Sequence, residues 1–303
     1  MAAQSPASDK SQWDLERIVD ELHTARAEWR ASEHRSVDSG DRAFPSPEAL
    51  VRIAAELRGV LFPMRLGPPD LRQESEDFYV GSALDSALNA LRRQVELELA
   101  PRGGDAIAIV REFAAALPAA RRLLDTDVRA AYSGDPAAHS VDEVLLCYPG
   151  VFAMIHHRLA HLLYRLGVPV LARMFAEIAH TRTGIDIHPG ASIGASFFID
   201  HGTGVVIGET AIIGERVRLY QAVTLGAKRF AVGEDGALRK GEARHPIVED
   251  DVVIYAGATV LGRITIGRGA TIGGNVWLTR SVPPGAHVTQ ADSLHELTAG
   301  STR

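Results

Sequence analysis

Residues 246–278 read PIVEDDVVIYAGATVLGRITIGRGATIGGNVWL, and within this stretch an aliphatic side chain recurs at every sixth position. The recurring residues are Val248, Ile254, Val260, Ile266, Ile272 and Leu278. Two positions before each stands another apolar or small residue: Pro246, Val252, Ala258, Ile264, Ala270 and Val276. A period of six fits neither the helical turn of about 3.6 residues nor the alternation of a strand. It is typical of a parallel β-helix, in which each unit is a short strand and a turn.

The same period extends upstream and is interrupted once. It runs in sixes from Ile187 to Ile199 and then slips by two residues across 201–204. Of the 28 glycines in the chain, 18 fall within 184–285, where tight corners need residues that adopt positive φ. A sandwich of ordinary short strands would instead place turn signals about every 8–12 residues. The regular sixes therefore favour a β-helix over a sandwich.

Before the repeat, the apolar residues follow a helical spacing. Ser46-Pro47-Glu48 combines an N-cap, a proline at the first helical position and an acid in the first turn. We expect a helix from there to Pro63, another after Ser75, and a boundary between two helices at Pro118. The later helices are expected over 107–117, 118–128, 141–146, 152–166 and 169–180.

The predicted fold class is therefore α+β, with an all-helical N-terminal domain followed by a parallel β-helix of hexapeptide repeats. The change of period near residue 183 suggests more than one domain. The predicted limits are a disordered tail over 1–12, the helical domain over 13–183, the β-helix over 184–285 and a C-terminal tail over 286–303.

Composition argues against several classes of protein. A net charge of −6 and an isoelectric point near 6.1 give no sign of nucleic-acid binding. The single cysteine, Cys147, excludes an internal disulfide, and its apolar neighbours predict a buried side chain. The first residues lack the basic and apolar parts of a secretory signal, and the longest apolar run, 144–155, is short for a bilayer. We expect a soluble, cytoplasmic protein that binds neither nucleic acid nor membrane.

Three groups of polar residues interrupt the repeat. They are Asp186 and His188, Asp200 and His201, and Arg244 and His245. A histidine beside a carboxylate suits a general base, because the carboxylate fixes the ring tautomer and stabilises the imidazolium. From this pattern alone, each of these histidines is more readily explained as a turn residue than as a catalytic residue. Upstream, His157 and His161 are spaced like a metal pair, but Arg158 stands where a metalloprotease helix has Glu, which favours two histidines satisfied by neighbours.

Longer stretches carry a resemblance to one family. DIHPGA at 186–191, IDHGTGVVIGET at 199–210, VTLG at 223–226, RHP at 244–246 and GNVWL at 274–278 resemble bacterial serine O-acetyltransferases. The resemblance covers the whole repeat and, more loosely, the helices before it. It implies a left-handed parallel β-helix, assembled as a homotrimer or a dimer of trimers with sites between neighbouring subunits. Such enzymes transfer acetyl from acetyl-CoA to the L-serine hydroxyl, giving O-acetyl-L-serine for cysteine synthesis.

The resemblance also implies roles for particular residues. His201 matches the general base, and Asp186 matches the carboxylate of its dyad, reaching it across a subunit interface. The positions that match the serine-binding set are Asp135 and Asp200 for the amino group and Arg244 and His245 for the carboxylate. This set is coherent, because a zwitterionic amino acid needs opposite charges at a fixed separation. The helical domain thus contributes to oligomerisation and, through Asp135, to the serine site.

For acetyl-CoA, the resemblance points to small residues that let the pantetheine lie against the backbone. The matching positions are Gly226, Ala256, Gly257 and Gly274. The loop over 227–243 is longer and more charged than in the enteric members and resembles a longer-loop subgroup. Its basic residues could meet the CoA phosphates, although a solvated loop is the commoner explanation for such charges. No cofactor beyond the co-substrate acetyl-CoA is expected, and no metal.

The end of the chain departs from the family pattern. The family docks onto O-acetylserine sulfhydrylase through a C-terminal Ile, which Arg303 cannot replace, so we expect no tight complex of that kind. Three rival readings stay open: another hexapeptide acyltransferase with a different amino-acid or sugar acceptor, a zinc hydrolase resembling γ-class carbonic anhydrase, and a non-catalytic trimeric scaffold. The zinc family has two ligand histidines five residues apart, and no such pair occurs from Asp186 onward.

Overall fold

The computed structural model describes residues 13–32, 44–229, 233 and 236–291. The predicted tail over 1–12 and residues 292–303, which include Arg303, lie outside these ranges. The chain divides into two compact units, 1–44 and 45–303. Within the first unit, α1 (Leu15–Ser32) buries none of its side chains.

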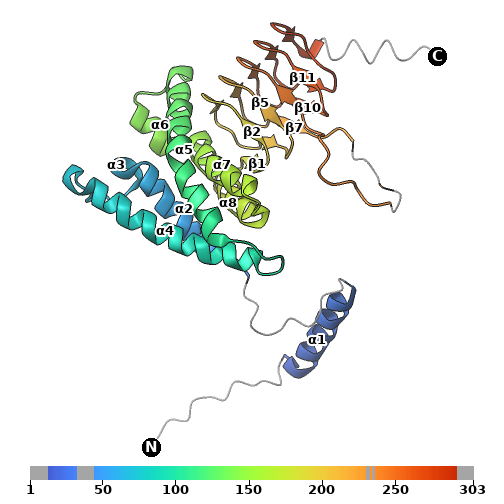
Figure 1. Ribbon diagram of the computed structural model, residues 1–303. Helices are drawn as coiled ribbons and strands as arrows, with labels where there is room; N and C mark the ends of the chain where they lie inside the picture. The colour runs from blue at the N-terminus through green and yellow to red at the C-terminus, as the bar shows by residue number, and fades with distance from the viewer. Residues whose placement is uncertain (1–12, 33–43, 230–232, 234–235, 292–303) are drawn as a thin grey trace, which may run out of the picture. The chain divides into compact units, whose positions relative to one another are not determined.

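The second unit begins with a layer of helices (Figure 1). They are α2 (Pro47–Leu61), α3 (Pro63–Leu66), the 3₁₀ turn η1 (Gln73–Ser75), α4 (Glu76–Leu99), α5 (Ala106–Gly134), α6 (Val141–Cys147), α7 (Pro149–Arg165) and α8 (Pro169–Thr183). The start of α2 is as predicted, because the Ser46 side chain accepts a hydrogen bond from the Ala49 N–H and Pro47 follows the cap. In the described ranges, no helix has the length and apolar content needed to span a bilayer.

Three expectations about the helices are wrong. α5 runs unbroken through Pro118, because Leu117 and Ala120 are buried on either side of it and tertiary packing outweighs the local preference. Cys147 is exposed, since it ends α6 beyond the residues that face the core. The buried Nδ1 of His157 has no hydrogen-bond partner in the described part of the chain, although His161 Nδ1 does contact the Pro189 carbonyl at 2.8 Å.

The repeat forms fourteen short strands within the described ranges. They are β1 (Asp186–Ile187), β2 (Ser192–Ile193), β3 (Phe198–Ile199), β4 (Val206–Ile207), β5 (Ile212–Ile213), β6 (Arg218–Leu219), β7 (Thr224–Gly226), β8 (Ile247–Val248), β9 (Val253–Ile254), β10 (Thr259–Leu261), β11 (Thr265–Ile266), β12 (Thr271–Ile272), β13 (Trp277–Leu278) and β14 (His287–Val288). β14 lies beyond residue 285, the predicted limit of the β-helix, and the domain limits stay a prediction.

The strands form three parallel sheets that wind into a three-sided coil (Figure 1). Sheet A has the order β1-β4-β7-β10-β13, sheet B has β11-β8-β5-β2, and sheet C has β14-β12-β9-β6-β3. From β1 to β13, successive strands belong to successive sheets, so the predicted parallel β-helix is confirmed. The aliphatic residues at every sixth position from 248 to 278 are at most 6% exposed and fill its interior.

Three corners connect the sheets, and each is named by the sheets that it joins. Corner C/A comprises residues 200–205, 220–223, 255–258 and 273–276. Corner A/B comprises 188–191, 208–211, the described residues among 227–246 (227–229, 233 and 236–246) and 262–264. Corner B/C comprises 194–197, 214–217, 249–252 and 267–270. Corners C/A and A/B therefore border sheet A on its two sides.

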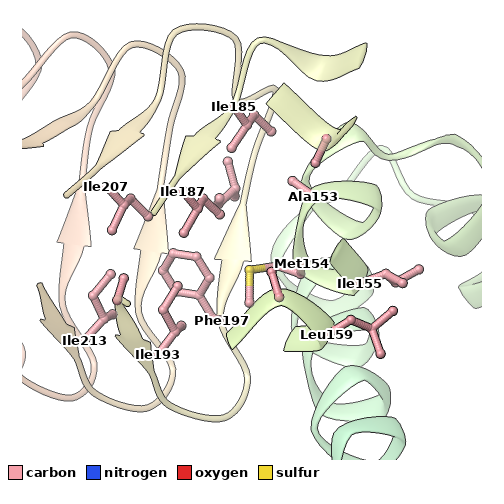
Figure 2. Close-up of a cluster of buried hydrophobic side chains, with 14 of the residues drawn as sticks. Ala153, Met154, Ile155, Leu159, Ile185, Ile187, Ile193, Phe197, Ile207 and Ile213 are labelled. Carbon is pink, nitrogen blue, oxygen red and sulfur yellow. The ribbon is translucent and has the colours of Figure 1, made fainter. Parts of the chain in front are cut away.

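The helical layer covers the first coil of the β-helix. α5 and α7 contact β3, and α8 contacts β1. Figure 2 shows Ala153 and Met154 of α7 beside Ile185, Ile187 and Phe197 of the first coil. These five side chains are at most 4% exposed, and burial of an Ile or Phe contributes about 1.5–3 kcal/mol. The two layers thus share one hydrophobic core.

A buried ion pair also joins the two layers. Arg158 of α7 and Asp127 of α5 are 7% and 2% exposed, and Arg158 Nη2 lies 3.1 Å from both carboxylate oxygens. The same guanidinium donates to the carbonyls of Ile193 and Gly194, while Asp127 accepts from the N–H of Phe197 at 3.0 Å. Burial raises the pKa of Asp127 to about 6, against the opposing positive charge of Arg158.

The first coil has no earlier coil with which to form backbone hydrogen bonds. These contacts take the place of the hydrogen bonds that an earlier coil would make. Along the β-helix, the N–H groups that end each strand donate to carbonyls of the following coil, as Gly194 does to Ile213. In the first coil, Arg158 is the donor to the Ile193 carbonyl. A buried backbone group left without a partner costs about 1–3 kcal/mol. The helices therefore stabilise the end of the coil by hydrogen bonding as well as by apolar contact.

We expect Asp127→Ala to lower the free energy of unfolding by about 3–5 kcal/mol, because it leaves the Arg158 guanidinium buried without its carboxylate. The measurement is urea unfolding at pH 7 and fixed subunit concentration. Asp125→Ala is the matched control on α5: its partly exposed pair with Arg121, at 3.0 Å, should be worth about 1 kcal/mol or less. Equal losses in the two variants would contradict the capping role.

His156 of α7 is a buried histidine outside the repeat. Its side chain is 1% exposed, and its Nδ1 lies 2.8 Å from the Phe152 carbonyl. Burial lowers the pKa of His156 to about 4, and the positive charges of Arg58 and Arg182 add to this shift. Since the unfolded chain has a histidine pKa near 6.5, the folded state binds fewer protons between the two values. This contribution to stability is complete above pH ~6.5 and is lost as the pH falls towards 4.

The pH dependence of unfolding should therefore respond to His156. We expect the free energy of unfolding to fall between pH 7 and pH 5, and to fall less in His156→Gln, whose amide can still donate to the Phe152 carbonyl. Urea unfolding at a series of pH values measures this, with the exposed His139→Gln as control. The same slope in His156→Gln and the unchanged protein would refute the assignment.

Candidate active site

The interruption of the repeat lies in corner C/A of the first coil. Backbone hydrogen bonds put Asp200 and Thr203 level with two consecutive residues of the next coil, 220 and 221. The two extra residues are therefore His201 and Gly202, with positive φ values of 56° and 90°. A Cβ at Gly202 would lie 2.5 Å from Ile185 Cδ1, so this turn requires glycine. The slip in the period thus puts His201 on the corner with its side chain 71% exposed.

Two carboxylates lie near this histidine. Asp200 Oδ1 is 3.9 Å from His201 Nε2. Asp135, the C-cap of α5, accepts hydrogen bonds from the Tyr148 hydroxyl at 2.5 Å and from the Ala137 N–H at 2.8 Å. The Tyr148 hydroxyl, the Ala137 N–H and then the charge of a protonated His201 lower the pKa of Asp135, while the same hydrogen bond raises the pKa of Tyr148 to about 12. Asp135, Asp200 and His201 are called the acidic group below.

Arg244 and His245 form a second group, called the basic group, in corner A/B. Arg244 Nη2 donates to Glu209 Oε2 at 2.7 Å, and the Tyr164 hydroxyl donates to the other oxygen at 2.9 Å. Burial alone would raise the pKa of Glu209, but the hydrogen bonds from Arg244 and Tyr164 hold it below its ordinary value. Glu209 is therefore an anion that positions the guanidinium of Arg244.

Thr210 holds the two basic residues in place. Its Oγ1 accepts from the N–H groups of Arg244 and His245, at 2.9 and 3.1 Å, and lies 2.9 Å from His245 Nδ1. The Thr210 N–H also donates to that Nδ1, at 3.1 Å. In the neutral ring, Nδ1 is consequently the acceptor and Nε2 carries the proton. Burial and then the charge of Arg244 lower the pKa of His245, so the ring is a neutral donor through Nε2.

The acidic and basic groups lie at opposite sides of sheet A. Corner C/A carries the acidic group, which Asp135 joins from α5, and corner A/B carries the basic group. In the described part of the chain, no hydrogen bond or ion pair connects the two groups. One copy of the chain thus brings Asp135, Asp200 and His201 together, and separately Arg244 and His245.

Asp186 lies between the two groups, on β1 of sheet A. Its neighbour Ile187 points into the coil, so Asp186 is on the outer face of the sheet. Its negative charge acts on His188, whose pKa burial lowers to about 4. Among the residues that the structure describes, no hydrogen bond or ion pair joins Asp186 to His201. The predicted dyad is therefore not formed within one chain.

Three of the four residues predicted to bind acetyl-CoA share corner C/A with His201. Ala256 and Gly257 lie in one coil, and Gly274 is in the next, where the Asn275 N–H donates to the Ala256 carbonyl. Gly257 has a φ of 73°, and a Cβ there would lie 2.2 Å from Asn275 Oδ1. Gly226 ends β7, at the other side of sheet A.

The described part of the long loop borders a basic hollow of about 480 Å³ at corner A/B. Its charged lining residues are Lys228, Arg229, Arg239, Glu242, Arg244 and Arg263. Arg263 donates to the carbonyls of Thr210 and His245, at 2.6 and 3.0 Å, which fixes it beside the basic group. Lys240 of the same loop is exposed and does not line the hollow.

Comparisons with known proteins first define the class. Residues 245–280 match the family described as bacterial transferase hexapeptide (six repeats), which identifies the repeat as that of the hexapeptide class of transferases. The chain is 54% identical over 305 residues to a plasmid serine acetyltransferase of Synechococcus elongatus, covering 95% of each chain. It belongs to the serine acetyltransferase family. A serine acetyltransferase of Mycobacterium tuberculosis is 52% identical over 54% of this chain and 67% of its own length.

Solved structures agree with this assignment. Serine acetyltransferase 1 of Entamoeba histolytica, crystallised with L-cysteine, has a TM-score of 0.70 and 42% identity, covering 78% of this chain and 86% of its own. A soybean serine acetyltransferase complexed with serine has a TM-score of 0.53 and 33% identity, covering 80% and 96%. The left-handed β-helix behind a helical domain, predicted from the resemblance, is thereby confirmed.

Three residues that organise the site were not predicted from the sequence. Glu209 and Thr210 stand in the quoted stretch 199–210 but received no role, although a polar pair following an inward Ile207 and Gly208 is a signal of a built corner. Tyr148 had no signal, because its bond to Asp135 joins residues that only the packing of α5 and α7 brings together. Within the described ranges, no three His, Cys, Asp or Glu residues are arranged to hold a metal ion.

The pKa of Asp135 should depend on Tyr148. Tyr148→Phe removes the largest cause of its lowering, so we expect the Asp135 pKa to rise towards its ordinary value. A pH titration followed by ¹³C NMR of labelled aspartates measures the change. Tyr132→Phe, at an exposed tyrosine of α5, is the control and should leave Asp135 unchanged. An Asp135 titration that is unaffected in Tyr148→Phe would contradict the hydrogen bond as its cause.

Proposed function

We propose that this chain is a serine O-acetyltransferase, transferring acetyl from acetyl-CoA to the hydroxyl of L-serine to give O-acetyl-L-serine for cysteine synthesis. Membership of the serine acetyltransferase family supports the reaction. The observation that carries it for this chain is the exposed His201, flanked by Asp135 and Asp200 at the break in the repeat. A base beside two carboxylates suits a hydroxyl acceptor that also carries an ammonium group.

In the proposed reaction, acetyl passes directly between the two substrates. His201 takes the proton of the serine hydroxyl while the oxygen attacks the thioester carbonyl. The C–S bond then breaks, and the protonated His201 gives its proton to the departing thiolate of CoA. Positioned acid–base catalysis contributes about 10²–10⁴-fold, and holding two substrates in register supplies much of the rest. We assign Asp186 of a neighbouring subunit as the carboxylate that orients the ring.

The amino acid is proposed to bind by its two charged ends. The carboxylates of Asp135 and Asp200 would hold the ammonium group. Arg244 offers a planar fork to the serine carboxylate, and His245 adds a neutral donor at Nε2. Glu209 and Thr210 position these two donors without touching the substrate.

A site built from both groups needs a second copy of the chain. The acidic and basic groups lie on opposite sides of sheet A, and between them the outer face of the sheet exposes Val206 and Trp277, at 38% and 63%. Three copies with this face around a common axis would bring corner C/A of one subunit to corner A/B of the next. We therefore propose a homotrimer, or a dimer of trimers, with sites between neighbouring subunits.

Acetyl-CoA is proposed to bind along the later coils. Gly226, Ala256, Gly257 and Gly274 would let the pantetheine lie against the backbone, and the basic hollow beside the loop offers cations to the CoA phosphates. The scheme uses no further cofactor and no metal. The expected lack of tight docking to O-acetylserine sulfhydrylase rests on Arg303, outside the described residues, and stays a prediction, as does the cytoplasmic location.

An acceptor panel tests the function. Release of the CoA thiol is measured with acetyl-CoA and L-serine, L-homoserine or amino sugars. We expect the highest kcat/KM for L-serine. A higher value with a sugar would favour a different hexapeptide acyltransferase, and no thiol release with any acceptor would favour a non-catalytic scaffold.

The shared site predicts complementation between two inactive variants. His201→Ala and Arg244→Ala should each lose activity by about 10²-fold or more, because one removes the base and the other a charge of the serine site. Co-expression lets a site form from His201 of one subunit and Arg244 of another. In a random mixture, roughly one interface in four is then intact. Thiol release near a quarter of the unchanged protein is expected, and no recovery would argue for sites within single subunits.

A further inference from the structure

We propose that this chain has a second site, which binds a phosphate group in a hollow between α5 and the second coil of the β-helix. The hollow has a volume of about 380 Å³, within the range of about 300–1,000 Å³ typical of small-molecule pockets. The residues that line it are Thr126, Arg129, Ala130, Ser133, Ser196, Phe198, Arg216, Val217 and Arg218. They belong to α5, corner B/C and sheet C, whereas the acidic and basic groups border sheet A.

The charge of the hollow is positive and only partly compensated. Three arginines line it and no acidic side chain does. Arg216 is neutralised by Glu215 and Asp251, at 2.7 and 2.6 Å. Arg129 and Arg218 form no ion pair within 4.0 Å in the part of the chain that the structure describes. Two guanidinium groups without a carboxylate at ion-pair distance therefore share one hollow, with the charge of Asp135 acting on Arg218 from farther away, and a bound dianion would interact favourably with both.

The first coil and α5 hold Arg218 in place before any ligand arrives. Its guanidinium carbon lies 5.3 Å from the centre of the Phe198 ring, close enough for a cation–π contact. A Cβ at Gly134 would lie 2.5 Å from Arg218 Nη2, so the guanidinium occupies space that only a glycine leaves open. A side chain that is already positioned loses less conformational entropy when it binds.

The donors around the hollow suit a phosphate group. Arg129 and Ser133 are one turn apart on α5 and face the same side, and Ser196 adds a hydroxyl from the first coil. Two guanidinium forks and the hydroxyl groups can donate to all three acceptor oxygens of a phosphate. A carboxylate has only two oxygens and would use fewer of these donors. The volume leaves room for a small organic group, so the ligand is inorganic phosphate or a small organic phosphate.

Calorimetric titration without CoA tests the proposal, using inorganic phosphate, glycerol 2-phosphate and, at equal ionic strength, chloride. We expect saturable binding of at least one phosphate and none of chloride. Arg129→Gln and Arg218→Gln should each weaken binding about tenfold or more, because each removes a charge-assisted contact. Arg122→Gln, an arginine of α5 outside the hollow, is the matched control and should bind as the unchanged protein does.

Two results would overturn the proposal. One is the absence of saturable phosphate binding up to roughly 10 mM phosphate. A dissociation constant of that size corresponds to a binding free energy of about −3 kcal/mol. The other is binding that survives in Arg129→Gln but is lost in Arg229→Gln, which would move the phosphate to the hollow beside the loop. Arg129 is exposed, so its variant should fold even where Arg218→Gln does not. Binding needs no acetyl transfer, so its outcome is independent of the proposed function.

Discussion

The guanidinium of Arg158, held by Asp127, closes the end of the β-helix where the chain enters it. Each coil of such a fold bonds only to its neighbours, so the arrangement of the first coil is passed on to all the others. The first coil in turn depends on α5 and α7 for the hydrogen bonds that no earlier coil can supply. Asp135 is the C-cap of α5 and Tyr148 the N-cap of α7, so the helices that cap the coil also bring these two side chains to His201.

The chemistry of the site depends on a local failure of the repeat. The strands before and after a corner must stay in register with those of the neighbouring coils. The inserted pair, His201 and Gly202, leaves the neighbouring coils paired and projects one imidazole into solvent. The long loop departs from the period in the same way, at the other side of sheet A. Regular coils provide the frame, and the two departures from regularity carry His201 and the basic residues beside the loop.

Much of the fold was predictable because its signal is local. Both inward positions of each six-residue unit are apolar, so the interior residues from Val248 to Leu278 could be named without a structure. The break at His201 was visible for the same reason. Long-range pairings were not visible: nothing in the sequence ties Asp127 to Arg158, thirty-one positions away. Pro118 misled, because the burial of α5 overrides the helix-breaking tendency of one residue. The roles of the site residues came from family resemblance, and the geometry alone would have suggested two separate polar groups.

Thr210 fixes His245 as a donor, and in the proposed scheme this donor contacts the carboxylate of the amino acid and not the group that reacts. In the proposed scheme, Arg244, His245, Asp135 and Asp200 contact only the ammonium and carboxylate of the amino acid, and these groups are the same in substrate, transition state and product. Contacts of that kind are uniform: they lower the substrate concentration needed for saturation but leave the chemical barrier unchanged. They would hold O-acetyl-L-serine as firmly as L-serine. Only contacts around His201, where the hydroxyl becomes an ester, can then distinguish L-serine from O-acetyl-L-serine.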